Sequence, residues 1–281
     1  MKTAIIIDSA CGVKDLSKYK DTFLVPLLIL REDGTSLKDD ENFTEEQFNN
    51  LNGKELLRTS QSITGEMLNK WDELLKDYDQ VICLLISKGL SGQFNTFKMF
   101  ANNEENGYKG KVHIIDNNGV SILIKRQLEE VRYLLDKGLE PIEVCQKIEN
   151  KYENIKGYII PKSLEQLVRG GRVTKAAASL AKILKITPIL SYTGIIDKED
   201  KTRTFKKAIE NSLDKIIKNE TDDYVIDIAY SDCSIELLEE IKKIVIQKNL
   251  KIGLVEKLPF VIICHTGAET FAFFATKVNK F

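Results

Sequence analysis

Short apolar runs alternate with longer amphipathic segments along the first half of the chain. The runs have the length and the β-branched content of buried strands, and they are apolar throughout instead of alternating. Strands of this kind are covered on both faces, as in a mostly parallel sheet between helices. The pattern therefore predicts an α/β fold for this half. The predicted strands are 4–7, 23–30, 81–86 and 112–115, and the predicted helices are 44–51, 64–76, 91–102 and 120–137.

The pattern changes after a further helix predicted at 141–152, which begins with a proline at a favoured helix-entry position. Several later strands alternate polar and apolar residues, which predicts an α+β domain with a half-exposed sheet. A chain of 281 residues is long enough for two domains, and we expect them at 1–155 and 156–281. The later strands are predicted at 158–160, 189–191, 225–229, 252–255, 261–264 and 270–275, with helices at 176–184, 205–218 and 235–248.

Composition limits the classes of partner and compartment. The 41 Lys and Arg residues almost balance the 42 Asp and Glu residues, so the basic excess of a nucleic-acid-binding protein is missing. The five cysteines are scattered without metal-ligand spacing, which predicts reduced thiols and no metal site. No apolar run approaches the roughly 18 residues of a membrane span, and the N-terminus does not resemble a signal peptide. We expect a cytoplasmic protein.

Polar loops follow three of the predicted parallel strands. They are Asp8–Gly12, 87–93 and 116–119. Ligands of open α/β sheets gather beyond the carboxyl ends of the strands, so the three loops predict a shared crevice. Each loop by itself is also compatible with ordinary turn and capping chemistry.

Ser91 and Gly92 form the most specific of these loops. A hydroxyl beside the N–H groups of a helix N-terminus makes a site for an anion. Thr59 and Ser60 supply further hydroxyls before another predicted helix, and His265 with Thr266 lies in a polar loop after a predicted strand. A lone histidine is more often structural, and His113, inside a strand, is interpreted as structural.

A serine hydrolase is the second functional hypothesis. Gly89-Leu90-Ser91-Gly92 approaches the Gly-x-Ser-x-Gly nucleophile turn, but its second glycine comes one residue early. In this hypothesis His265 is the base and Asp8 orients it.

The chain contains neither of the common glycine-rich nucleotide-binding motifs. Gly170-Gly171-Arg172 is compatible with close helix packing or with a flat wall beside an apolar ligand.

The order and spacing of several motifs resemble the DegV family. The resemblance implies a two-domain α/β protein that binds one long-chain fatty acid in a buried tunnel between or beside its domains. It implies no cofactor and no catalysis by this chain. Some bacterial members carry the acyl chain for a fatty acid kinase, whose separate ATP-using subunit makes acyl phosphate for phospholipid synthesis. The motifs are Ile7-Asp8-Ser9-Ala10, Arg58-Thr59-Ser60-Gln61, Leu90-Ser91-Gly92, Gly170-Gly171-Arg172-Val173, Pro188-Ile189-Leu190, Gly194, Arg203 and His265-Thr266-Gly267.

The resemblance also implies a fatty-acid site. Thr59 and Ser91 would hold the carboxylate with help from N–H groups near Gly92, His265 would complete the polar network, and Arg203 would lie at the rim near the kinase partner. The chain departs from the family at Gln93, where Leu-Ser-Gly is usually followed by Thr, and at Ala268-Glu269, where His-Thr-Gly is usually followed by Pro-Gly. These changes leave the carboxylate donors in place. The implied site comprises Thr59, Ser60, Ser91, Gly92, Gln93, Arg203, His265 and Thr266.

Overall fold

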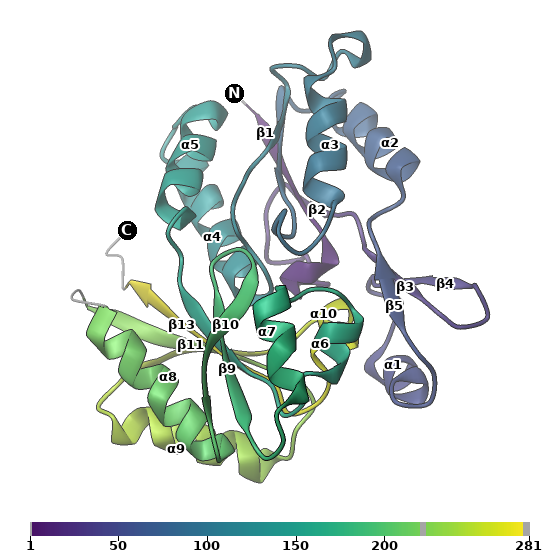
Figure 1. The fold of residues 1–281 in the computed structure, drawn as a ribbon. Coiled ribbons are helices and arrows are strands. Elements are labelled where there is room, and N and C mark those ends of the chain that lie inside the picture. Colours follow the sequence, from purple (N-terminus) through teal and green to yellow (C-terminus); the bar gives the residue numbers. More distant parts are fainter. Residues whose placement is uncertain (1, 220–222, 278–281) are drawn as a thin grey trace. The chain divides into compact units, whose positions relative to one another are not determined.

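The chain folds into two compact units in a computed structural model that describes residues 2–219 and 223–277 (Figure 1). The N-terminal unit comprises Met1–Asn154 and Pro259–Cys264. The C-terminal unit comprises Ile155–Leu258 and His265–Phe281. The sequence did not predict that residues 259–264 group with the first unit.

A parallel four-stranded sheet with the order β2-β1-β6-β7 forms the centre of the N-terminal unit. Helices α2 and α3 lie on one face of this sheet, and α4 and α5 lie on the other (Figure 1). The α/β architecture predicted for the first half is confirmed. The strands are β1 (Thr3–Ile7), β2 (Thr22–Leu24), β6 (Gln80–Leu84) and β7 (Val112–Ile114), and the helices are α2 (Thr64–Leu74), α3 (Gln93–Asn102), α4 (Ile122–Asp136) and α5 (Pro141–Tyr152).

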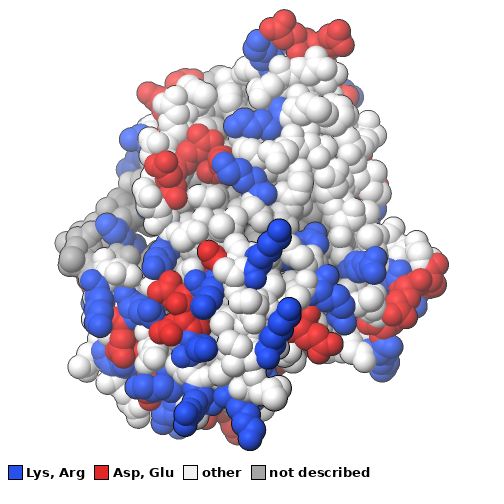
Figure 2. All heavy atoms as spheres, viewed as in Figure 1, with Lys and Arg blue, Asp and Glu red and all other residues white. Residues whose placement is uncertain are grey.

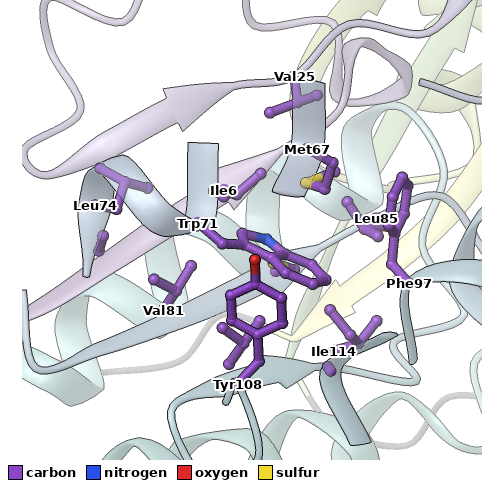
Figure 3. Packing of buried hydrophobic residues seen from close by; sticks show 14 of the residues in the cluster. Ile6, Val25, Met67, Trp71, Leu74, Val81, Leu85, Phe97, Tyr108 and Ile114 are labelled. Carbon is purple, nitrogen blue, oxygen red and sulfur yellow. The ribbon is translucent and has the colours of Figure 1, made fainter. Parts of the chain in front are cut away.

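The aromatic core on the α2–α3 face is built around Trp71, whose side chain is fully buried (Figure 3). Its ring meets the rings of Phe97 and Tyr108 edge-on, with centroid separations of 5.9 and 5.1 Å. Ile6 of β1 faces this core, whereas its neighbour Ile5 is equally buried without belonging to it. Successive side chains of a strand point to opposite faces, so a strand covered on both sides is apolar at every position.

A small antiparallel sheet with the order β4-β3-β5 completes the N-terminal unit. The prediction of one strand over 23–30 is wrong, because β2 pairs in the parallel sheet and β3 pairs in this second one. Pro26 lies between them and has no N–H to donate to a strand ladder. The elements are β3 (Leu28–Leu30), β4 (Ser36–Lys38), α1 (Glu45–Leu51) and β5 (Arg58–Ser60), and a 3-10 turn η1 (Ser9–Cys11) follows β1.

The C-terminal unit is an α+β domain, as predicted, with a six-stranded sheet of order β10-β9-β8-β13-β11-β12. Only β11 and β12 are parallel neighbours in this sheet, and α8 and α9 pack against one of its faces. Its strands are β8 (Gly157–Ile160), β9 (Thr187–Tyr192), β10 (Ile196–Thr202), β11 (Tyr224–Tyr230), β12 (Ile252–Lys257) and β13 (Phe271–Lys277). Its helices are α6 (Glu165–Arg169), α7 (Lys175–Ser179), α8 (Phe205–Asn219) and α9 (Ile235–Gln247).

Helix α10 (Phe260–Thr266) occupies the place of the strand predicted at 261–264, so that prediction is wrong. A short apolar run has the same pattern in a buried strand and in a buried helix. The helix begins after Pro259, whose carbonyl accepts hydrogen bonds from the N–H groups of Ile262 and Ile263. Its first residues belong to the N-terminal unit and His265 belongs to the C-terminal unit, so the chain crosses from one to the other within this helix.

Within residues 2–219 and 223–277, no helix combines the length and the apolar character that crossing a bilayer requires.

Candidate functional site

The loops that follow β1, β6 and β7 are joined directly to one another at the carboxyl edge of the parallel sheet. Ser87 N donates to the carbonyl of Gly119 at 2.8 Å, and Ser121 N donates to the carbonyl of Ala10 at 2.7 Å. The three polar loops singled out in the sequence therefore lie together. Backbone hydrogen bonds connect one loop to the next, because backbone N–H and C=O groups that are removed from water need partners.

Asp8 is the buried centre of these contacts. Its Oδ1 accepts from Ala10 N at 3.0 Å, and its Oδ2 accepts from Ile86 N at 2.8 Å and from Gln93 Nε2 at 2.6 Å. The side chain is fully buried, and burial raises its pKa from 3.8 to about 7 against the opposing effect of these hydrogen bonds. Three N–H groups occupy the carboxylate, which argues against the role of orienting a catalytic histidine.

Gln93 is also fully buried, and both ends of its amide are bonded to the protein. Nε2 donates to Asp8, and Oε1 accepts from Ser62 N at 2.7 Å. The residue was predicted to contact a ligand, but its side chain bridges the loop after β5 and the loop after β1. Gln93 thereby ties the Thr59–Ser62 segment to the first turn of α3.

The hydroxyl groups on either side of this bridge are half-buried. Thr59 and Ser60 lie on β5, which is paired with β3 in the register Ile29–Thr59. Ser91 Oγ accepts from Gln93 N at 3.2 Å at the start of α3, and Gly92 is exposed at the helix N-cap. No atom lies within 4 Å of where a β-carbon of Gly92 would be. The N-terminal unit thus holds two clusters of hydroxyls, one of them at an open helix N-terminus.

The three other predicted site residues belong to the C-terminal unit. His265 lies at the end of α10 beside Thr266, which is buried, and Arg203 is exposed in the turn between β10 and α8. Burial and the nearby Arg172 lower the pKa of His265 to about 4. The ring is therefore neutral at pH 7 and a weak general base, which further disfavours the hydrolase hypothesis.

Gly170 explains part of the Gly-Gly-Arg motif. A β-carbon at this position would lie 2.4 Å from Nδ1 of His265, well inside van der Waals contact. Similarly, a β-carbon at Gly267 would lie 1.8 Å from Oε1 of Gln166. The two glycines let α6 approach the end of α10, so the interpretation of the motif as close packing is confirmed at Gly170.

Asp39 and Lys14 were not found from the sequence. Asp39 is fully buried, and its Oδ1 lies 2.7 Å from Lys14 Nζ. Its other oxygen accepts a longer hydrogen bond, 3.4 Å, from Val261 N at the start of α10. Lys14 Nζ also lies 4.4 Å from the ring centroid of Phe260. Neither residue is part of a recognisable sequence motif. Only their contacts with residues distant in the sequence reveal them.

Charges on the face shown in Figure 2 are mixed, with Lys and Arg side chains lying among Asp and Glu. The histidine, cysteine and carboxylate side chains of residues 2–219 and 223–277 form no group of three or more that could hold a metal ion.

Comparison with known proteins identifies the family. A model described as "Uncharacterised protein, DegV family" matches residues 2–278. The chain belongs to the DegV family. A DegV domain-containing protein of Mycoplasmopsis pulmonis is 30% identical over 291 residues, which cover 100% of this chain and 96% of the relative. One from Staphylococcus aureus (strain N315) is 28% identical and covers 86% and 87%.

Solved DegV structures share the fold. A fatty acid binding DegV family protein from Streptococcus agalactiae superposes with a TM-score of 0.86 at 26% identity, covering 99% of this chain and 100% of that one. A DegV family protein from Thermus thermophilus, whose structure is described by its fatty acid binding, gives 0.85 at 25% identity with the same coverage. The predicted DegV-like fold class is confirmed.

Substituting Gly170 tests the packing of His265. Gly170 has helical dihedral angles, so in Gly170→Ala we expect the damage to come from the contact with the ring and to lower the free energy of unfolding by about 1–3 kcal/mol. Urea denaturation would measure the loss. Gly65→Ala is the matched control, because that helical glycine has open space around it and should gain up to about 1 kcal/mol. Equal effects in the two variants would contradict the contact.

The buried Asp8 predicts a pH dependence of stability. Its folded-state pKa lies above its ordinary value of 3.8, so between about pH 4 and 7 the folded DegV protein holds a proton that the unfolded chain has released. The free energy of unfolding should therefore fall as the pH rises through this window. Asp8→Asn cannot titrate, so the stability difference between wild type and variant should be larger at pH 4 than at pH 8. A difference that is constant with pH in urea denaturation would refute this assignment.

Proposed function

We propose that this DegV protein binds a long-chain fatty acid and holds its carboxylate with hydroxyl groups and a helix N-terminus. The observation that carries the proposal is the pair of half-buried hydroxyl clusters of the N-terminal unit, Thr59–Ser60 and Ser91, bridged through Gln93. The fatty acid binding of the related proteins from Streptococcus agalactiae and Thermus thermophilus supports it.

The chemistry of the clusters suits a carboxylate. An anion that leaves water needs several donors, and hydroxyl and N–H groups give charge-assisted hydrogen bonds to it. Gly92 leaves the N-terminus of α3 open, where the helix dipole favours negative charge. The resemblance assigns His265, Thr266 and Arg203 of the C-terminal unit to the same function. Arg203 would lie at the rim of the site, near the head group and the kinase partner.

The acyl chain would supply most of the binding free energy from a buried tunnel. Each methylene that is removed from water contributes about 0.8 kcal/mol, so a long chain can be held firmly after the entropic cost of association. The mixed surface charge in Figure 2 suits a ligand whose single charge is neutralised locally.

We further propose that the protein is a carrier and not an enzyme. It would present the fatty acid to a separate ATP-using kinase, which forms the acyl phosphate. The sequence contains neither of the common glycine-rich nucleotide-binding motifs, and the Asp8 carboxylate is occupied by backbone and amide donors. The occupied carboxylate favours a binding role for Ser91 over a nucleophilic one.

Ligand that co-purifies with the protein tests the proposal most directly. We expect mass spectrometry of an organic extract of protein purified from bacteria to show long-chain fatty acid in an amount comparable to the protein. Delipidated protein should then bind palmitate or oleate in a calorimetric titration. An extract without fatty acid, together with no heat of binding for either ligand, would overturn the proposal.

Ser91→Ala tests the assigned head-group cluster. The variant should lose about 1–3 kcal/mol of oleate affinity, roughly a 5- to 150-fold rise in Kd, because it removes one donor to the carboxylate. The control is Ser234→Ala, since Ser234 also accepts a backbone N–H at a helix start, from Leu237 N at 3.2 Å in α9. We expect that variant to lose stability and keep its affinity. Unchanged affinity in Ser91→Ala would remove Ser91 from the site.

A further inference from the structure

The amide of Gln93 has a defined orientation. The Ser62 backbone N–H can only donate, so the atom that faces it at 2.7 Å must be the oxygen, Oε1. The nitrogen, Nε2, then faces Asp8 Oδ2 at 2.6 Å and donates to it. A side chain with the same shape but without this pair of groups would leave two buried polar groups unpaired.

Gln93 also connects the two hydroxyl clusters. Its backbone N–H is bonded to Ser91 Oγ, while its side chain holds the backbone of Ser62, three residues after Thr59. The Ser62 hydroxyl in turn donates to the carbonyl of Val25 at 3.1 Å. On the other side, the β3–β5 ladder holds Thr59 and Ser60. One buried side chain thus links the two clusters.

We propose that Gln93 is a positioning residue: with Asp8 as its anchor, it fixes the Thr59–Ser60 hydroxyls relative to Ser91 in the geometry that receives the ligand's anionic head group. This inference rests on the proposed function. Gln93 acts through the groups that it holds, because each end of its fully buried amide is bonded to the protein. A displacement of about an ångström between donors weakens recognition of a carboxylate substantially.

Asp39 is a charged neighbour of the anchor: it raises the pKa of Asp8, and it is itself paired with Lys14. The Cys11 thiol lies nearby, and burial raises its pKa to about 12, so it stays neutral. Burial raises the pKa of Asp8, and a second carboxyl group at position 93 would have to share a proton with it to keep the bridge.

Gln93→Leu removes both side-chain hydrogen bonds while retaining a similar volume. Without ligand, we expect the Ser62 amide to exchange with deuterium faster than in the wild type, as followed by mass spectrometry. With oleate, we expect the Kd to rise at least about tenfold. Thermal melting by circular dichroism would verify that the variant is folded at the temperature of the titration.

Gln93→Glu tests the chemistry of the bridge. At about pH 6 one shared proton lets the introduced carboxyl group donate to Asp8 and accept from Ser62, so affinity relative to wild type should return to within about threefold. Two adjacent buried carboxyl groups hold the shared proton above the ordinary carboxyl range, so affinity should fall toward that of Gln93→Leu only at the high pH, about pH 9 or above, at which the pair loses it. Gln61→Glu is the matched control, because the Gln61 amide is bonded to two hydroxyl groups, those of Thr64 and Thr96, where Gln93 is bonded to a carboxylate. The affinity of this variant relative to wild type should not change between the two pH values.

Each result decides one part of the proposal. An unchanged exchange rate of Ser62 in Gln93→Leu overturns the bridge, and faster exchange with wild-type affinity overturns its role in ligand positioning. A Gln93→Glu protein that matches Gln93→Leu at about pH 6 overturns the part assigned to Asp8. Wild-type protein that binds no oleate overturns the proposed function and the positioning role with it, while Ser62 exchange separately decides whether the bridge exists.

Discussion

The buried carboxylate of Asp8 is the interaction on which the carboxyl edge of the parallel sheet in the N-terminal unit depends. A carboxyl group at this depth is tolerated only with donors on its oxygens, and here they come from its own turn, from the end of β6 and from α3. Each donor holds one segment at a set distance from β1. The loops of a parallel sheet, which have no ladder of their own, are thereby fixed relative to one another.

In the C-terminal unit, close packing constrains the surroundings of another polar side chain, His265. His265 is kept neutral by burial and by Arg172, and the absence of a β-carbon at Gly170 is what allows α6 to reach its ring. In both units, the polar group singled out by the sequence is held by a neighbour whose size matters as much as its chemistry. Gln93 is long enough to bridge two segments, and Gly170 is small enough to let two helices meet.

Local signals in the sequence predicted several elements well. The Thr44–Gln47 capping box is present at the start of α1, and the apolar run at 4–7 is β1, an inner strand of the parallel sheet. Predictions failed where a local pattern is ambiguous. The run at 261–264 is equally apolar as helix or strand, and the strand β10 was missed because its charged residues have no apolar alternation; its pairing with β9 determines its conformation.

The sequence by itself determined the family, the class of fold and the candidate residues, because motifs such as Leu-Ser-Gly and Gly-Gly-Arg and the strand–helix alternation are written in consecutive residues. Tertiary structure alone decided what those residues contact. Gln93 meets Asp8 across 85 positions of sequence and Ser62 across 31, and Asp39 meets Val261 across 222. A hydrogen bond depends on distance and direction in space, and neither is encoded in the spacing of residues along the chain.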